Sequence, residues 1–205
     1  MTKRTQNKNQ KFENLIKAAF ELFEKKDTGA VSIDEIVQRA GVAKGTFYLY
    51  FQNKPDLIAK MILKKANESL SGQGIHKEIK TEAEFDLAAK KILDYLTEFL
   101  EQNKTLTKLI DKNVHICVQA VLDTSETAFR DLYDKITKYF VERGVPKEEI
   151  SIKMYIYLET VVSSCCNAIL RGRPGDLEEV KANLYDIVTL SRYHIVQKRE
   201  QKEHA

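Results

Sequence analysis

The stretch GVAKGTFYLYF, residues 41–51, gathers side chains that could contact a nucleic acid. Between positions 44 and 50 it holds a lysine, a glycine, a leucine and three hydroxyl-bearing residues. Ammonium and hydroxyl groups bind phosphates and base edges, an apolar group contacts a thymine methyl, and a missing Cβ lets DNA approach closely. A glycine inside a helix costs about 1 kcal/mol relative to alanine, so this helix does not suit a purely structural role.

The 100° step of an α-helix divides this stretch into two faces. Phe47 and Phe51 are four residues apart, and we expect both to point into a small core. The remaining positions face outward or lie on the flanks: Gly45, Thr46, Leu49, Tyr48 and Tyr50. For either tyrosine alone, covering the linker to the rest of the chain explains the sequence equally well. Both tyrosines together, beside two lysines, favour a surface that faces DNA.

Three short helical segments must position these groups. Apolar residues form one stripe between positions 12 and 23, and Gly29 follows the segment as a stop signal. Ser32 and Glu35 have the spacing of a capping box, and Gly41 ends that second helix. A third helix over about 44–51 follows at once, which is the layout of a helix-turn-helix motif. Residues 1–11 are polar and basic, and we expect them to form a loose arm.

Charge is distributed unevenly along the 205 residues. Residues 1–54 carry ten basic and six acidic side chains, a net charge of +4, whereas the remainder carries 23 basic and 24 acidic ones, or −1. A basic module on a neutral body favours a polyanionic partner, although scattered solubilising charge would look similar. We therefore expect a DNA-binding domain over residues 1–54 and a second domain over residues 55–205.

The rest of the chain reads as amphipathic helices, so the predicted fold is all-α. Their expected ranges are about 54–71, 82–102, 104–121, 125–143, 147–171 and 176–197. Asn53 suits the N-cap of the first of these, with Pro55 in its first turn. Since we find no apolar leader and no run of about 18 apolar residues, we expect a cytoplasmic protein without a membrane span.

The segment VSIDEIVQRAGVAKGTFYLYFQNKPDLI, residues 31–58, closely resembles the DNA-binding segment of the TetR/AcrR family of bacterial transcriptional regulators. The resemblance covers residues 12–62. It implies a homodimer that binds a palindromic operator, and repression that a small-molecule effector relieves. It assigns base-edge or groove-floor positions to Lys44, Gly45 and Tyr48, and backbone positions to Thr46, Leu49, Tyr50 and Lys54. Arg4, Lys8 and Lys11 could reach flanking phosphates, or could be a solvated arm.

Ala43 departs from the family pattern, which often has a hydroxyl-bearing residue there to cap the recognition helix. The missing cap could cost about 1 kcal/mol of local helix stability. In the second domain, the family forms its dimer through two helices that correspond to about 147–171 and 176–197. The first is apolar or small on most faces, with Ser163, Ser164, Cys165, Cys166 and Ala168 clustered. We expect the effector pocket among the helices spanning residues 82–171.

The sequence also leaves open functions that depend on the three cysteines and a function without DNA binding. A thiol enzyme would pair Cys117 with His115, but a helix points residues two apart about 200° away from each other. Cys165 and Cys166 could make the protein a redox sensor, and a helical adaptor could keep the fold without binding DNA. We expect no catalytic residue, metal site or cofactor, because no ligand spacing or phosphate-binding loop is present.

Overall fold

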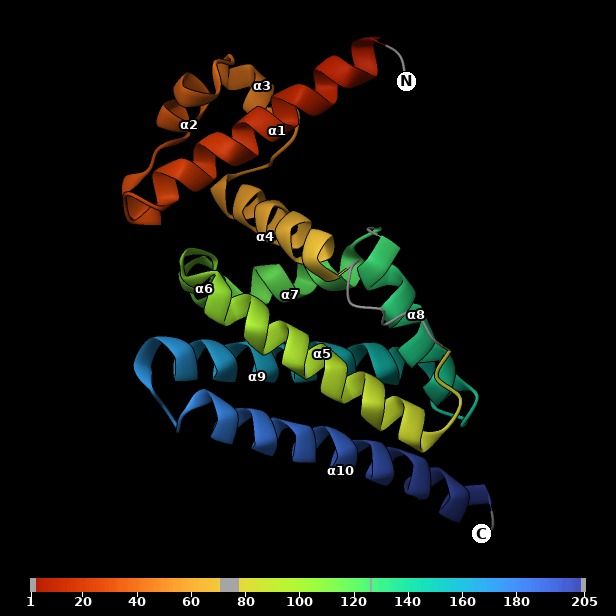
Figure 1. Cartoon of the computed structure of the whole chain (residues 1–205). Coiled ribbons are helices and arrows are strands. Elements are labelled where there is room, and N and C mark those ends of the chain that lie inside the picture. The colour runs from red at the N-terminus through yellow and green to blue at the C-terminus, as the bar shows by residue number, and fades with distance from the viewer. Residues whose placement is uncertain (1–2, 71–77, 126, 204–205) are drawn as a thin grey trace. The chain divides into compact units, whose positions relative to one another are not determined.

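A computed structural model of the chain describes residues 3–70, 78–125 and 127–203 (Figure 1). These residues form ten α-helices and one short 3-10 helix, which confirms the all-α prediction. The elements are α1 (Lys3–Phe23), η1 (Thr28–Ala30), α2 (Ile33–Ala40), α3 (Lys44–Tyr48), α4 (Lys54–Leu70), α5 (Glu82–Gln102), α6 (Lys104–Asp111), α7 (Val114–Asp123), α8 (Thr127–Val141), α9 (Lys147–Arg171) and α10 (Leu177–Glu203).

The chain divides into two compact units, Met1–Ile62 and Leu63–Ala205. The first unit holds α1, α2 and α3, and α4 crosses from the first unit into the second. Helix α4 starts as its sequence predicts, because the Asn53 Oδ1 atom accepts a hydrogen bond of 2.9 Å from the backbone N–H of Asp56.

Two expectations about helices are wrong. Residues 3–11 are no loose arm, because α1 begins at Lys3 and runs on through the predicted apolar stripe, while residues 1–2 lie outside the described residues. The expected helix 104–121 is two helices, α6 and α7, separated near Asn113. In a continuous helix the Leu109 carbonyl would accept a hydrogen bond from the backbone N–H of Asn113. Here that N–H donates to Ile110, and the Asn113 side-chain amide donates to Leu109 at 2.8 Å.

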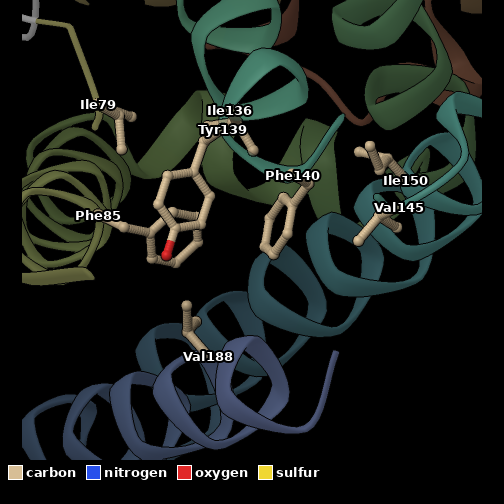
Figure 2. Packing of buried hydrophobic residues seen from close by; sticks show 8 residues of the cluster. All are labelled: Ile79, Phe85, Ile136, Tyr139, Phe140, Val145, Ile150 and Val188. Atoms are coloured by element: carbon tan, nitrogen blue, oxygen red, sulfur yellow. The ribbon is translucent and has the colours of Figure 1, made fainter. Parts of the chain in front are cut away.

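The core of the second unit contains an aromatic cluster, shown in Figure 2. Tyr139 is fully buried, and its ring centroid lies 5.0 Å from that of Phe85 and 5.1 Å from that of Phe140. Burial raises the pKa of the Tyr139 hydroxyl. The Arg143 guanidinium lies over the Tyr139 ring, 3.7 Å from its centroid. The cluster joins α5 and α8 to the two C-terminal helices.

Helices α5, α9 and α10 pack against one another, and α9 and α10 run antiparallel (Figure 1). Arg192 of α10 is buried, and it donates to Asp86 of α5 through Nε at 3.0 Å and Nη2 at 3.2 Å. A Glu82 oxygen lies 2.8 Å from Nη1 of the same guanidinium. Since an isolated buried charge is costly, these two carboxylates explain how an arginine continues the inward stripe of α10.

The outward stripes of α9 and α10 are apolar. Five of the nine large hydrophobic side chains exposed in the described residues lie on these two helices: Ile152, Ile156, Ile187, Leu190 and Tyr193. The two cysteines in the cluster of small residues on α9 do not lie on this exposed face, because Cys165 and Cys166 are fully buried within the protomer. Across the part of the chain that the structure describes, we find no helix long and apolar enough to span a membrane.

Candidate nucleic-acid interface

Helix α2 begins with the predicted capping box. The Ser32 hydroxyl accepts from the Glu35 backbone N–H at 3.1 Å, and the Glu35 carboxylate accepts from the Ser32 backbone N–H at 2.8 Å. The Lys26 ammonium donates to the same carboxylate at 2.7 Å. The hydrogen bond from Lys26, followed by those from Ser32, lowers the pKa of Glu35 to about 2. The start of α2 is therefore fixed by several charge-assisted contacts.

A glycine turn then redirects the chain into α3. Gly41 has φ 66° and ψ 35°, a left-handed conformation that L-residues with a Cβ rarely adopt. Its N–H donates to Gln38, and the N–H of Val42 donates to Val37 at 3.0 Å. Ala43 is the N-cap residue of α3, and it makes no side-chain hydrogen bond to the helix because its methyl group has no acceptor atom. The turn therefore depends on Gly41, while the start of α3 lacks a side-chain cap.

Phe47 and Phe51 hold α3 against the first unit, and their predicted burial is confirmed. Phe47 is fully inaccessible and Phe51 almost so. Their ring centroids lie 5.3 Å apart, and Phe12 of α1 stacks on Phe51 at 5.4 Å. Aromatic pairs at this separation add to the free energy of apolar burial. These rings fix which face of α3 turns to solvent.

That solvent face carries Tyr48 and Leu49, whose side chains are 53% and 78% exposed. Gly45 precedes them on the exposed side, and a Cβ added to it would have no neighbour within 4 Å. Packing within the protein therefore does not require glycine at position 45. Thr46 is half-buried. An exposed tyrosine and leucine beside an unobstructed glycine form a surface that suits close approach of DNA.

Lys44 opens α3 but is already paired. Its Nζ atom lies 2.9 Å from Oδ1 and 3.0 Å from Oδ2 of Asp34, a residue in the first turn of α2. The hydrogen bond and charge of Asp34 raise the pKa of Lys44. Sequence reasoning missed Asp34, because the two residues are ten positions apart and meet only across the turn.

Tyr50 and Lys54 are bound within the first unit. The Tyr50 hydroxyl donates to the Lys8 carbonyl of α1 at 2.9 Å, and its ring meets Phe12 edge-on at 5.9 Å. The half-buried Lys54 ammonium donates to the carbonyl oxygens of Thr28 at 2.5 Å and Val31 at 2.8 Å. Both side chains thus brace the three-helix unit.

Lys60 is a further residue that sequence reasoning missed. Its ammonium donates to the Tyr50 carbonyl at 2.8 Å and to the Asp56 carboxylate at 3.0 Å. It also lies 5.5 Å from the centroid of the Phe51 ring. The Asp56–Lys60 spacing of four residues on a helix is the signal that could have suggested the ion pair. Lys60 holds the chain where it leads from α3 into α4.

The cysteine and histidine candidates do not form a reactive site. Cys117 is buried whereas His115 is exposed, as residues two apart on a helix should be. Burial raises the pKa of the Cys117 and Cys166 thiols to about 12 and that of Cys165 to about 11. Because the thiolate is the nucleophile and the form that oxidises readily, these environments oppose thiol chemistry. Among the described residues, no three His, Cys, Asp or Glu side chains group as metal ligands.

Residues 15–61 match the family model of bacterial regulatory proteins of the tetR family. The regulator YvdT of Bacillus subtilis is 25% identical over 144 residues, which are 69% of this chain and 70% of YvdT. Three further regulators, from Bacillus subtilis and Staphylococcus aureus, are matched over 49%, 50% and 51% of their own lengths. The sequence likeness therefore includes the whole candidate interface.

Solved structures extend the likeness to the whole fold. A TetR transcriptional regulator from Rhodococcus sp. RHA1 superposes with a TM-score of 0.55 at 19% identity, covering 90% of this chain and 98% of that one. FadR of Bacillus subtilis, solved in complex with stearoyl-CoA, gives 0.51 at 16% identity and covers 87% and 97%. At these identities the likeness shows a shared fold over most of both chains.

Proposed function

Because the chain belongs to the TetR family of DNA-binding transcriptional regulators, and not to a family of enzymes, we propose that it is a homodimeric repressor. In this proposal a small molecule releases it from a palindromic operator. The recognition surface comprises Lys44, Gly45, Thr46, Tyr48, Leu49, Tyr50 and Lys54.

The observation that carries the proposal is the bare face of α3. Tyr48 and Leu49 are exposed, whereas Phe47, which points from α3 into the core, is inaccessible to solvent. An exposed tyrosine hydroxyl and an exposed leucine are available to bond a base edge and to pack against a thymine methyl. The second helix of a helix-turn-helix motif enters the major groove with its N-terminal residues toward base edges. Gly45 and Tyr48 therefore meet the groove, and Thr46 and Leu49 lie toward its walls.

Dimerisation is proposed through α9 and α10, whose outward stripes expose Ile156 and Leu190. A two-fold dimer places two recognition helices on half-sites about 34 Å apart on one face of the DNA. A shift of a few ångströms between these helices prevents both from docking. Helix α4 is continuous through the boundary between the two units, so it is the proposed route by which an effector changes that spacing.

The effector is proposed to bind the second unit. A ligand shifts DNA binding only by its differential affinity for the two dimer conformations, and a tenfold change in operator affinity needs about 1.4 kcal/mol of coupling. FadR of Bacillus subtilis, which shares the fold, was solved with stearoyl-CoA. Stearoyl-CoA is therefore the first effector to test.

Selection from a library of random duplexes tests the function directly. The full-length protein should enrich a palindrome whose half-sites are about one helical turn apart. The Tyr48→Phe and Lys44→Ala variants should enrich altered sequences. If the parent protein enriches nothing, the proposed function is wrong. If both variants select the same sequence as the parent, the proposed recognition surface is wrong. Adding stearoyl-CoA to the enriched complex then tests this effector by gel shift.

Two alternative functions are separated by the same assay. A helical adaptor would show no sequence enrichment. A cysteine redox sensor would lose operator binding on oxidation and keep it after replacement of the thiols. We do not favour the sensor, because Cys165 and Cys166 are fully buried and their thiol pKa values are raised.

A further inference from the structure

The only charged residue of α3, Lys44, is held by a carboxylate on the preceding helix. The Lys44 Nζ atom lies 2.9 Å from Oδ1 and 3.0 Å from Oδ2 of Asp34, so both carboxylate oxygens contact the ammonium. Both side chains are more than half exposed, so the pair lies on the surface and not in the core. The lysine that the DNA should meet therefore comes with a neutralising partner.

Asp34 changes what Lys44 contributes to DNA binding. Sequence-independent affinity comes from cationic side chains that neutralise phosphates and release counterions. The Lys44–Asp34 pair brings no net charge to the DNA. A phosphate that approached the paired ammonium would bring a second negative charge beside the Asp34 carboxylate, whereas a neutral base edge would not. A phosphate therefore competes poorly for Lys44.

A base edge offers different chemistry. Guanine presents two acceptors, N7 and O6, in the major groove, and a lysine can bind both. That contact forms only where the sequence places guanine opposite the start of α3. Elsewhere the ammonium keeps its carboxylate partner.

We propose that Asp34 is a specificity-determining residue, which withholds Lys44 from phosphates and yields it to an aligned base edge. This inference rests on the proposed DNA-binding function. Exposed ion pairs contribute little free energy, so the pair opens at modest cost. Asp34 therefore lowers binding to random DNA without preventing binding to the correct site.

The test compares four variants of the full-length protein: Asp34→Asn, Lys44→Ala, the double variant, and Glu24→Gln. Glu24→Gln is the matched control, because it removes one exposed carboxylate from the first unit just beyond the end of α1. Fluorescence anisotropy measures binding to a labelled 30-bp duplex of random sequence at several KCl concentrations. The same titration is repeated with the duplex that the parent protein enriches from a random library.

Asp34→Asn should tighten binding to the random duplex by about two- to five-fold, the range expected for freeing one exposed ion-paired lysine. It should also steepen the slope of log K against log salt by about one. Its gain on the enriched duplex should be smaller, so the specificity ratio falls. In the Lys44→Ala background the gain should shrink to that of Glu24→Gln.

Three results would overturn the inference while leaving the proposed function intact. They are a gain no larger than that of Glu24→Gln, a gain that persists without Lys44, and weaker binding to random DNA. Failure of the parent protein to enrich any duplex would instead remove the proposed function. Circular dichroism checks folding, and Asp34→Ala replaces Asp34→Asn if the latter is unfolded.

Discussion

Ala43 leaves the start of α3 without a side-chain cap, although its φ of −71° and ψ of 151° are those of an N-cap residue. A threonine there can accept a hydrogen bond from the first turn, so Ala43→Thr should stabilise α3 by about 1 kcal/mol. Hydrogen exchange of the α3 amides in the full-length protein measures this. Ala43→Val is the control, because valine has the shape of threonine without the hydroxyl. Equal protection in both variants would contradict the assignment.

Lys54 tests whether a predicted DNA contact is a structural residue. Its ammonium donates to the carbonyls of Thr28, which begins η1, and of Val31, which follows it. Lys54→Met keeps the aliphatic stem but leaves both carbonyls without this donor, so we expect a loss of about 1–3 kcal/mol in urea unfolding. The slope of random-duplex affinity against salt reports separately on phosphate contact. A slope lowered by about one, with unchanged stability, would return Lys54 to the DNA-contact set alone.

The capping box at the start of α2 should make the stability of the first unit depend on pH. Glu35 has its pKa lowered to about 2, chiefly by the hydrogen bond from Lys26. A carboxyl whose folded pKa lies below its unfolded value adds stability above the unfolded pKa, and that stability disappears as pH falls. We therefore expect unfolding to become easier between about pH 4.5 and pH 2.

Glu35→Gln isolates this effect, because glutamine keeps an acceptor oxygen but has no titrating charge. The variant should be less stable than the parent at pH 6, and its thermal unfolding midpoint should vary less between pH 5 and pH 2. Ser32→Ala removes the hydroxyl partner and should also flatten the curve. Parallel curves for the parent and Glu35→Gln would show that the carboxylate does not carry the pH dependence.

Helical patterns predicted which elements exist better than they predicted where contacts form. The capping box at Ser32, the stop at Gly41 and the burial of Phe47 follow from local spacing, and the structure confirms them. The break at Asn113 was missed because the apolar period continues through it, while the side-chain amide competes for a backbone carbonyl. The Lys44–Asp34 pair joins different helices, so no local period could reveal it.

The last helix, α10, carries apolar side chains on both its buried face and its exposed face. Val180, Leu184 and Val188 turn inward on α10, and the neighbouring positions Ile187 and Leu190 turn outward. The sequence indicated an apolar helix pair but could not divide its residues between the protomer core and a second copy. That division depends on how α10 is rotated against α5, which Arg192 fixes through Asp86.

The proposed dimer depends on the outward face of α9 and α10, where exposed apolar side chains include Ile156 and Leu190. Fully burying one such side chain contributes about 1.5–3 kcal/mol, and two-fold symmetry buries each residue twice. A charge at either position would be buried without a partner in the dimer. Ile156→Asp or Leu190→Asp should therefore convert a dimer into monomers in sedimentation equilibrium, and should weaken binding to a palindromic duplex far more than to a half-site.

Leu87→Asp supplies the matched control for this prediction. Leu87 is 55% exposed on α5 and Leu190 is 58% exposed on α10, so the two substitutions place the same charge at equally exposed leucines. If the control remains dimeric and Leu190→Asp does not, the loss of assembly comes from the α9–α10 face and not from the added charge. If Ile156→Asp and Leu190→Asp both remain dimeric, the two recognition helices must be joined through another surface, and the predicted half-site spacing loses its structural basis.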